Sequence, residues 1–476
     1  MLLLNMKEKE NKKFIYFDNA ATTKPLKVAV DAFNQICESC YGNPSSDHGV
    51  GKLSKNMILQ ANDETQNMLC TKKGDIIFVP SATIANNIAI LGRVRFLQKL
   101  KKRKTRVEKI EKNNLENCEE HLKTDDDHIV KVLFSEFDHP SLVEPVKSLD
   151  EIKYFSVDLP GLYKYIKPSN EKSIYGSGKG LESYIISQYQ KKIEKERVDI
   201  LILQWVNNEN GLILPVLQIV KILKKTLPDI YIHIDATQGL MKLPFKEFML
   251  SMNEDKKVES IFDYIDSFTA SAHKFGSVKG AAILWLKEIG SIKPILFGGN
   301  QMSGVFPSTE NLPAIVSMAK TVEFLKGELD ARLKKALEYK IKLYKKIKND
   351  KILFDNLVVL DDFYYNDLND LNFKDDYEVY KKNSKKILFS PFIVKIYNKK
   401  LPAQVVQNIF NDNGIAVSIG SACSTNKKQI LKDNLYFGVP DNIASNGIRI
   451  SFFDEFEDKN LDTFLKVFKQ MLERYG

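Results

Sequence analysis

Short apolar runs recur along the first two thirds of the chain, and helical patterns separate them. Runs rich in Ile, Val, Leu and Phe indicate buried strands. The stretches between them predict helices at 51–69 and 84–96, and a long helix begins near residue 312. Strands that alternate with helices in this way are typical of an α/β fold. The predicted strands cover residues 75–79, 130–134, 199–206, 230–234 and 281–286.

One further apolar run, at 266–271, ends in a chemically unusual place. It leads into Ser271, His273 and Lys274, followed by a turn with Gly276 and another apolar run. A lysine held between two strands is unusual because removing its ammonium group from water is costly. A lysine of depressed pKa can form a Schiff base with an aldehyde cofactor. Taken alone, the stretch is still better explained by a solvated lysine in a surface turn.

The strand predicted at 230–234 changes this interpretation, because Asp235 follows it directly. Open parallel sheets bind ligands at the carboxyl ends of their strands. Pyridoxal phosphate needs a carboxylate against its pyridinium nitrogen so that the ring withdraws electrons. Asp235 and Lys274 together supply both groups, and the pair predicts a pyridoxal phosphate site.

Seven other short motifs lie along the chain, before and after the stretches that contain Asp235 and Lys274. They read FDNAATT at 17–23, GNPSSDH at 42–48, SATIANN at 81–87, DHP at 138–140, NNENG at 207–211, GSACS at 420–424 and IRIS at 448–451. In this order they resemble the cysteine desulfurases of the class V aminotransferase family. The resemblance covers nearly the whole chain, and the number of motifs makes it specific where any single motif would not be.

The resemblance implies an α/β protein with fold type I of the pyridoxal phosphate-dependent transferases. A large domain with a mostly parallel seven-stranded sheet is expected at 31–310, and a small α+β domain at 311–476, which carries the catalytic cysteine loop. Residues 1–30 are expected to contribute to the small domain. Three polar insertions interrupt this plan, at about 97–128, 167–195 and 355–384. The first is interpreted as a helix or a disordered excursion on the surface without chemistry, and what the three insertions do stays open.

The same resemblance assigns the cofactor-binding residues. His139 is implied to stack on the pyridoxal ring, and Asn208 and Gln238 to bind its phenolic oxygen. The helix that begins after Ser81 is implied to hold the phosphate, since helix N-termini present free amides; a simple helix-capping role for Ser81 or Thr83 stays open. The expected cofactor-binding residues are Ala82, Thr83, His139, Asn208, Asp235, Gln238, Ser271, His273, Lys274 and Thr309. Thr309 is implied to reach the phosphate of a neighbouring subunit, so a homodimer is expected.

The implied catalytic residues are Lys274, His139 and Cys423. Small residues and two nearby lysines around Cys423 suit an exposed thiolate, although a lone cysteine is more often buried and inert. Arg449 would bind the substrate α-carboxylate through two parallel hydrogen bonds, unless it is an ordinary strand-end arginine. Asn19 is also expected to contact the substrate, because its segment passes near the active site in the family.

The function that the resemblance implies is conversion of L-cysteine to L-alanine, with a persulfide formed on Cys423. The sulfur would pass to an iron–sulfur scaffold or to a carrier for tRNA thiolation. A selenocysteine lyase, another class V enzyme and a non-catalytic paralogue are the alternatives. The last is motivated by departures from the family pattern: Ile84 stands where glutamate is usual, and residues 306–308 where Arg-Ser-Gly is usual. Ser81 also replaces a usual glycine.

Composition adds a few limits. The chain has 476 residues and a net charge of +9, but its basic residues lie in mixed polar stretches, which favours a solvated surface over a nucleic-acid site. Five cysteines form no disulfide framework in a protein of this size, and Cys37 and Cys40 have no second pair at zinc-site spacing. No metal is therefore expected. No apolar run is long enough to span a membrane, so a cytoplasmic enzyme is expected.

Overall fold

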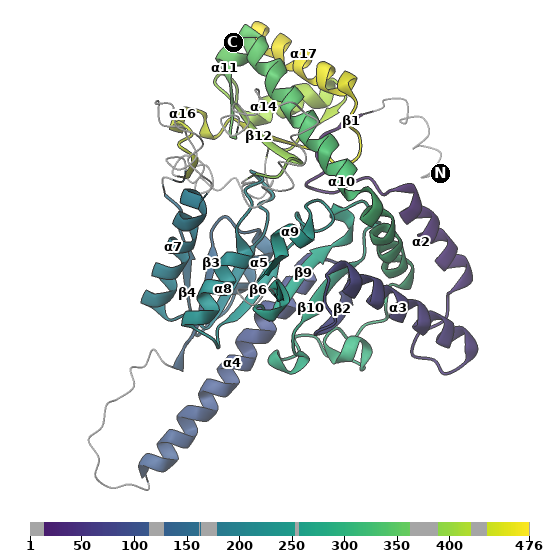
Figure 1. Cartoon of the computed structure of the whole chain (residues 1–476), viewed down its shortest axis with the longest axis vertical. Coiled ribbons are helices and arrows are strands. Elements are labelled where there is room, and N and C mark those ends of the chain that lie inside the picture. The colour runs from purple at the N-terminus through teal and green to yellow at the C-terminus, as the bar shows by residue number, and fades with distance from the viewer. Residues whose placement is uncertain are drawn as a thin grey trace.

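A computed structural model of the chain describes residues 14–113, 128–160, 162, 179–252, 257–361, 389–419 and 436–475. Its largest feature is a seven-stranded sheet with the strand order β2-β10-β9-β6-β5-β3-β4 (Figure 1). The strands are β2 (Asp75–Val79), β3 (Val130–Ser135), β4 (Ile152–Val157), β5 (Ile200–Gln204), β6 (Tyr231–Asp235), β9 (Ser267–Ser271) and β10 (Ala282–Leu286). Only β10 runs antiparallel to its neighbours. The predicted mostly parallel seven-stranded sheet is confirmed.

The central strands are apolar along their whole length because both faces of the sheet are covered. In β5, Leu201 and Leu203 belong to one hydrophobic cluster, while Ile200 and Ile202 belong to another. Alternate side chains of a strand point to opposite faces, so the two clusters lie on the two sides of the sheet. The helices of this part are α2 (Lys27–Ser39), α3 (Gly49–Met68), α4 (Ala82–Asn113), α5 (Pro140–Lys147), α7 (Lys179–Glu196), α8 (Val216–Thr226) and α9 (Phe245–Met249).

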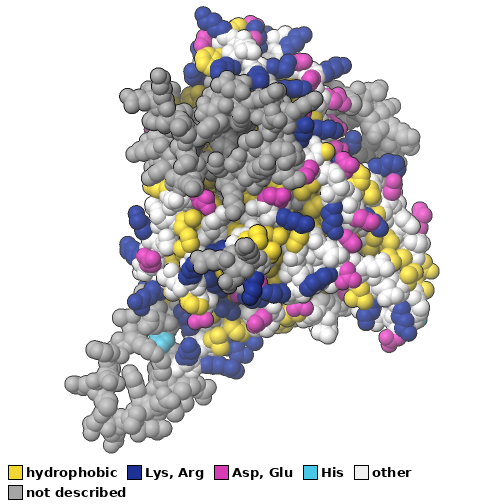
Figure 2. All heavy atoms as spheres, in the orientation of Figure 1, with side chains coloured by type: hydrophobic (Ala, Val, Ile, Leu, Met, Phe, Trp, Pro, Cys, Tyr) yellow, Lys and Arg dark blue, Asp and Glu magenta, His cyan; other side chains and the backbone are white. Residues whose placement is uncertain are grey.

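Helix α4 extends into the first insertion, for which the sequence left a surface helix and a disordered excursion open. The predicted helix ends at residue 96, where the first polar insertion begins, but α4 continues to Asn113 and projects away from the sheet (Figure 1). Figure 2 shows Lys and Arg side chains interspersed with Asp and Glu over the described part of the visible face. This mixture fits the interpretation of the positive net charge as a solvated surface.

A second, smaller unit is built on a three-stranded sheet with the order β11-β12-β14. It also contains the short parallel pair of β1 (Ile15–Tyr16) and β13 (Ile415–Ala416). The remaining strands and helices are β11 (Leu357–Val359), β12 (Ile393–Asn398), β14 (Gly447–Ser451), α11 (Lys351–Asn356), α14 (Ala403–Asp412), α16 (Asp441–Ala444) and α17 (Asp458–Tyr475). Apart from α16, whose Ile443 and Ala444 belong to the cluster of the large sheet, these elements surround a separate hydrophobic cluster.

Helix α10 (Leu312–Asn349) connects the two units. Most of its buried apolar residues from Ala314 to Ala336 pack in the cluster of the large sheet, while Leu312 and Val316 pack with Ile36 and Cys40. The buried apolar residues from Leu337 onward pack in the cluster of the small sheet. We propose on this basis that the domain boundary falls inside α10, near Leu337. Pairing of β1 with β13 puts Ile15 and Tyr16 in the small unit, and the contribution of residues 1–30 as a whole to the small domain stays a prediction.

A buried ion pair joins α10 to the end of β11. Lys340 Nζ lies 2.6 Å from Asp361 Oδ2 and donates to the carbonyl oxygens of Ser390 and Ile393, each at 2.9 Å. Tyr344 Oη donates to the other oxygen of Asp361 at 2.7 Å. Asp361 lies in the first part of the third insertion and Ser390 follows the insertion, so Lys340 holds both of these segments against α10.

Replacing Lys340 tests this arrangement. The Lys340→Ala variant leaves the buried Asp361 carboxylate without its cation, and we expect a loss of about 3–5 kcal/mol in unfolding free energy. Urea denaturation provides the measurement. Lys342→Ala is the matched control, because the Lys342–Asp458 pair is half exposed and should change stability by less than about 1 kcal/mol. Equal losses in the two variants would contradict the role assigned to Lys340.

Candidate active site

Four parallel strands end at one edge of the large sheet, and each is followed by a polar side chain singled out in the sequence. His139 follows β3, Asn208 follows β5, Asp235 ends β6, and Lys274 follows β9. Backbone pairing aligns Gln204 with Asp235, and Asp235 with Thr269. Because the carboxyl ends of parallel strands meet at one edge, residues from distant parts of the sequence gather there.

Lys274 ends a short 3-10 turn, Ala272–Lys274, that follows β9. Its Nζ donates to the carbonyl oxygens of Ala20 and Ala21, at 2.7 and 2.5 Å. Burial, and then the nearby positive charge of Arg449, lowers the pKa of Lys274 to about 8, although surrounding carboxylates act in the opposite direction. A substantial fraction of the side chain is therefore a neutral, nucleophilic amine near pH 8.

Asp235 is buried, and both of its carboxylate oxygens accept hydrogen bonds. Asn86 Nδ2 donates to Oδ2 at 2.9 Å, and the amide of Thr237 donates to Oδ1 at 2.8 Å. Asn86 in turn places its Oδ1 3.0 Å from His233 Nε2. His233 Nδ1 lies 2.8 Å from Ser267 Oγ.

This chain of bonds assigns the His233 tautomer. Because Asn86 presents its amide oxygen to Nε2, that nitrogen carries the proton. Burial lowers the pKa of His233 to about 4, so the imidazole is neutral at pH 7. Sequence reasoning missed Asn86 and His233 as supports for Asp235. The His-x-Asp spacing on β6, which puts both side chains on one face of the sheet, was an available signal.

His139 lies at the start of α5 and has a defined tautomer when neutral. The backbone amide of Ser141 donates to its Nδ1 at 3.1 Å, and Ser141 Oγ lies 2.8 Å from the same nitrogen. The proton is therefore on Nε2. Desolvation by burial lowers the pKa of His139, which favours the neutral ring. Its own amide donates to Gln204 Oε1 at 3.1 Å, tying it to the end of β5.

The start of α4 has the donors that a phosphate group needs. Ser81 Oγ accepts from the amide of Ile84 at 3.3 Å, while in the described chain the amides of Ala82 and Thr83 have no acceptor. Ser271 Oγ is buried and also unpartnered within the described structure. Ala282 of β10 pairs with both Val79 and Ser271, which aligns the end of β9 with the start of α4. Free helix amides beside an unpartnered hydroxyl fit an anion site.

His273 and Thr309 differ in how the structure positions them. His273 Nδ1 lies 3.0 Å from Thr22 Oγ1, next to Lys274. Burial, and then the neighbouring Lys274, lowers the pKa of His273 to about 3, so the ring is neutral. Thr309 is exposed, and in the described structure no hydrogen bond connects it to the groups around Lys274.

Arg449 reaches the same edge from β14 of the small sheet. Its Nη2 lies 2.8 Å from Asp18 Oδ1, and its Nη1 donates to the Asn208 carbonyl oxygen at 2.7 Å and to Glu209 Oε1 at 3.3 Å. Its Nε is buried without an acceptor among the described residues. The guanidinium is held by Asp18 and Glu209, two acids that sequence reasoning did not single out.

The amide side chains predicted for the site also have partners. Asn208 Oδ1 accepts from Gln204, and Gln238 Nε2 donates to the Ala20 carbonyl oxygen at 2.8 Å. Asn19 Nδ2 donates to the carbonyl oxygens of Tyr16 and Ser451, so this side chain joins β1 to β14. Sequence reasoning also missed Lys242, a buried lysine that donates to Gln238.

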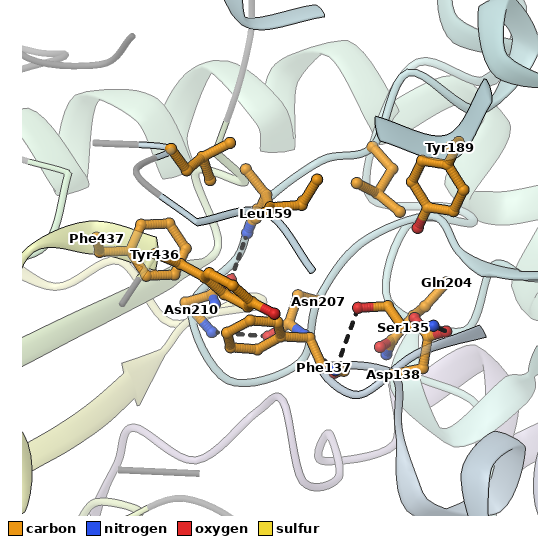
Figure 3. Close-up of a pocket in the computed structure, with 13 residues that line it drawn as sticks. Ser135, Phe137, Asp138, Leu159, Tyr189, Gln204, Asn207, Asn210, Tyr436 and Phe437 are labelled. Atoms are coloured by element: carbon orange, nitrogen blue, oxygen red, sulfur yellow. Dashed lines mark hydrogen bonds between the residues drawn. The ribbon is translucent and has the colours of Figure 1, made fainter. Parts of the chain in front are cut away.

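Cys423 lies outside the described residues, which resume at Tyr436. A small cavity of about 30 Å³ separates Tyr436 and Phe437 from the ends of β3 and β5 (Figure 3). The Tyr436 ring packs on Phe137 at 4.2 Å between centroids, and its hydroxyl donates to Asp158 at 2.6 Å. Tyr436, which follows the predicted cysteine loop in sequence, is thereby fixed against Phe137, two positions before His139. Burial raises the pKa of Asp138, which also lines this cavity, to about 8.

Across the described part of the chain, no group of three His, Cys, Asp or Glu side chains is arranged to hold a metal ion. No described helix is both long enough and apolar enough to cross a bilayer. Cys37, Cys40 and Cys70 are free thiols, and Cys40 is buried whereas Cys37 is exposed.

The chain matches known proteins over most of its length. A family model described as Aminotransferase class-V matches residues 15–153 and 178–354. "Cysteine desulfurase IscS" of Dictyoglomus turgidum is 26% identical, with 97% of this chain and 95% of that protein covered. "NifS/IcsS protein homolog" of Lactobacillus delbrueckii subsp. bulgaricus is 24% identical, with 97% and 98% covered.

Solved structures share the fold. One described as "NIFS-LIKE PROTEIN" has a TM-score of 0.70 at 21% identity, and the match covers 97% of this chain and 100% of that chain. The apo structure of a cysteine desulfurase from Thermococcus onnurineus NA1 has a TM-score of 0.64 at 18% identity, covering 97% and 95%. The α/β architecture with its mostly parallel central sheet is therefore a known one.

The support that Asn86 gives Asp235 can be tested by its removal. Asn86→Ala leaves Asp235 Oδ2 and His233 Nε2 buried without partners, and we expect a loss of about 2–4 kcal/mol in unfolding free energy. The neighbouring Asn87 bonds only to the carbonyl oxygen of Thr83 on an exposed face, so Asn87→Ala is the control. Urea denaturation of both variants measures the difference, and indistinguishable losses would argue against the network.

The lowered pKa of Lys274 predicts a pH profile. In the cofactor-free protein, the rate of acetylation at Lys274 should rise with pH around a midpoint of about 8, because only the neutral amine reacts. Peptide mass spectrometry after brief labelling measures this rate. Since the charge of Arg449 lowers the pKa, Arg449→Gln should raise the midpoint. A midpoint near 10.5, the ordinary value for lysine, would contradict the assignment.

Proposed function

The chain belongs to the class V aminotransferase family, and we propose that it is a cysteine desulfurase that uses pyridoxal 5′-phosphate. The observation that carries the proposal is the placement of Lys274 and Asp235 at one sheet edge, with the unpartnered amides of α4 beside them. Relatives named as cysteine desulfurases that align over 97% of the chain support the same reaction.

The described side chains fit this cofactor. Ala82, Thr83 and Ser271 offer unpartnered donors for its phosphate, and His273 lies beside them. The Asp235 carboxylate, fixed by Asn86 and Thr237, suits the pyridinium nitrogen. The amides of Asn208 and Gln238 would bind the phenolic oxygen. When bound, the ring would withdraw electrons from the substrate α-carbon.

The protein's own groups would then perform the remaining work. Arg449 would bind the substrate α-carboxylate. The buried Asn19, which donates to the carbonyl oxygens of Tyr16 and Ser451, would hold the N-terminal segment against β14 near Arg449. Lys274, with its lowered pKa, would hold the cofactor's aldehyde carbon before substrate arrives and later take the α-proton as a neutral amine. His139, with its proton on Nε2 and its ring half-buried, would move protons close to the reacting atoms.

Sulfur transfer would use Cys423. Its thiolate would attack the substrate sulfur, which forms an S–S bond and breaks the bond between that sulfur and the substrate β-carbon. The electron pair of the broken bond stays on the carbon fragment, which takes up protons and leaves as L-alanine. The persulfide on Cys423 would pass its terminal sulfur to an acceptor protein, either an iron–sulfur scaffold or a sulfur carrier.

We also propose that the active form is a homodimer. Thr309 is exposed, and Leu296 and Phe297, earlier in the same loop region, are 40% and 86% exposed. Large apolar side chains exposed close together are typical of protein interfaces. A second copy covering this region would bring Thr309 toward the phosphate of its neighbour, as the family resemblance implies.

Mass spectrometry tests the proposed reaction. After incubation of the cofactor-loaded protein with L-cysteine, the peptide with Cys423 should gain one sulfur atom while L-alanine accumulates. The exposed Cys37 and Cys70 provide internal control peptides that should stay unmodified. Lys274→Ala should lower alanine production by at least about 1,000-fold, since both covalent cofactor attachment and the base are lost. Full activity of Cys423→Ala would favour another class V reaction instead.

A further inference from the structure

Lys242 is buried beside the candidate site but has no role in the proposed reaction. Only 2% of its surface is exposed, and its Nζ donates to Gln238 Oε1 at 2.9 Å. Within the described part of the chain it has no carboxylate partner. Lysines are rarely buried to this degree unless they are paired with an acid.

The environment of Lys242 favours a neutral amine. Burial lowers its pKa well below the ordinary lysine value, and the positive charges of Lys274 and Arg449 lower it further. Lys340 shows the usual solution, since it is equally buried but lies against Asp361. Met241, immediately before Lys242, has a positive φ of 58°, an unfavourable conformation for a residue with a side chain. Such backbone strain concentrates at functional sites.

A chain of hydrogen bonds leads from Lys242 to Lys274. Lys242 Nζ donates to Gln238 Oε1, and Gln238 Nε2 donates to the Ala20 carbonyl oxygen at 2.8 Å. Lys274 Nζ donates to the same carbonyl oxygen at 2.7 Å. A glutamine amide has one oxygen and one nitrogen, so a donor on the oxygen determines which way the nitrogen faces.

We propose that Lys242 is a positioning residue that keeps Gln238 Nε2 facing the active site, where its second hydrogen binds the phenolic oxygen of the cofactor. This inference rests on the proposed function. An N–H donor at that oxygen favours the phenolate form of the ring. Lys242 acts through Gln238 alone, and its removal affects the ring only where Gln238 is present.

Pyridoxine 5′-phosphate is the appropriate probe, because it keeps the phenol and the phosphate but has no aldehyde to react with Lys274. Fluorescence titration of the cofactor-free protein measures its Kd. We expect Lys242→Met to weaken binding about tenfold, the effect of losing one hydrogen bond. Gln238→Ala should weaken it by a similar factor, and the double variant should be no weaker than Gln238→Ala. Lys246→Met, on the exposed face of α9, is the control and should match the parent protein.

Absorbance of the bound probe supplies a second measurement. It reports ionisation of the phenol, and the pH midpoint should rise by about one unit in Lys242→Met, because the phenolate loses an oriented donor. A purely structural role for Lys242 would leave this midpoint unchanged and would reduce resistance to urea. We expect the urea midpoint not to fall, since methionine fills the same space without a buried amine.

The outcomes separate the two proposals. If the parent protein binds neither the probe nor pyridoxal phosphate, the proposed function is wrong and the role of Lys242 is wrong with it. If the parent protein binds both, the inference about Lys242 is overturned by either of two results. One is binding and a phenol midpoint in Lys242→Met that equal those of the parent. The other is losses in Lys242→Met and Gln238→Ala that add in the double variant, since independent effects add.

Discussion

Removing lysine amines from water is the constraint on which the candidate site depends. Lys274 loses much of its hydration at the sheet edge, and two backbone carbonyl groups, from Ala20 and Ala21, replace it. Neutral carbonyl groups do not cancel a positive charge, so the amine keeps a lowered pKa of about 8. A nearby carboxylate bonded directly to Nζ would have stabilised the ammonium form and lowered its nucleophilicity.

Lys340, Lys242 and Lys274 show how the partner of a lysine amine decides the role of that amine. Lys340 is paired with Asp361 and two carbonyl groups, which suits a structural cation that joins α10 to the small sheet. Lys242 has a neutral amide as its partner, and Lys274 has neutral carbonyl groups. Of these three lysines, the two without a bonded carboxylate are the two at the candidate site. Burial lowers the pKa of all three amines, and only for Lys340 does a directly bonded carboxylate act against that effect.

The second feature of the site is its origin in both units of the molecule. The large sheet supplies Asp235, Lys274 and the start of α4, whereas β14 of the small sheet supplies Arg449. Residues 18–21 lie between them: Asp18 binds Arg449, and the carbonyl oxygen of Ala20 accepts from both Lys274 and Gln238. A change in the packing of the two units would therefore alter both the guanidinium and the amine. The N-terminal segment at residues 18–21 is the physical connection between Arg449 of the small unit and Lys274 of the large unit.

The sequence by itself determined the elements whose signals are local. Continuous apolar runs predicted the buried strands, and Asp235 and Lys274 were found because each directly follows such a run. Polar partners were not predictable, because contact between Asn86 and Asp235, 149 positions apart, depends on how α4 packs on the sheet. The sequence also left the length of α4 open, because the polar composition after residue 96 fits a surface helix as well as a disordered segment. Lys242 and the acids around Arg449 were decided only by the tertiary structure, because burial and charge pairing arise when distant segments meet.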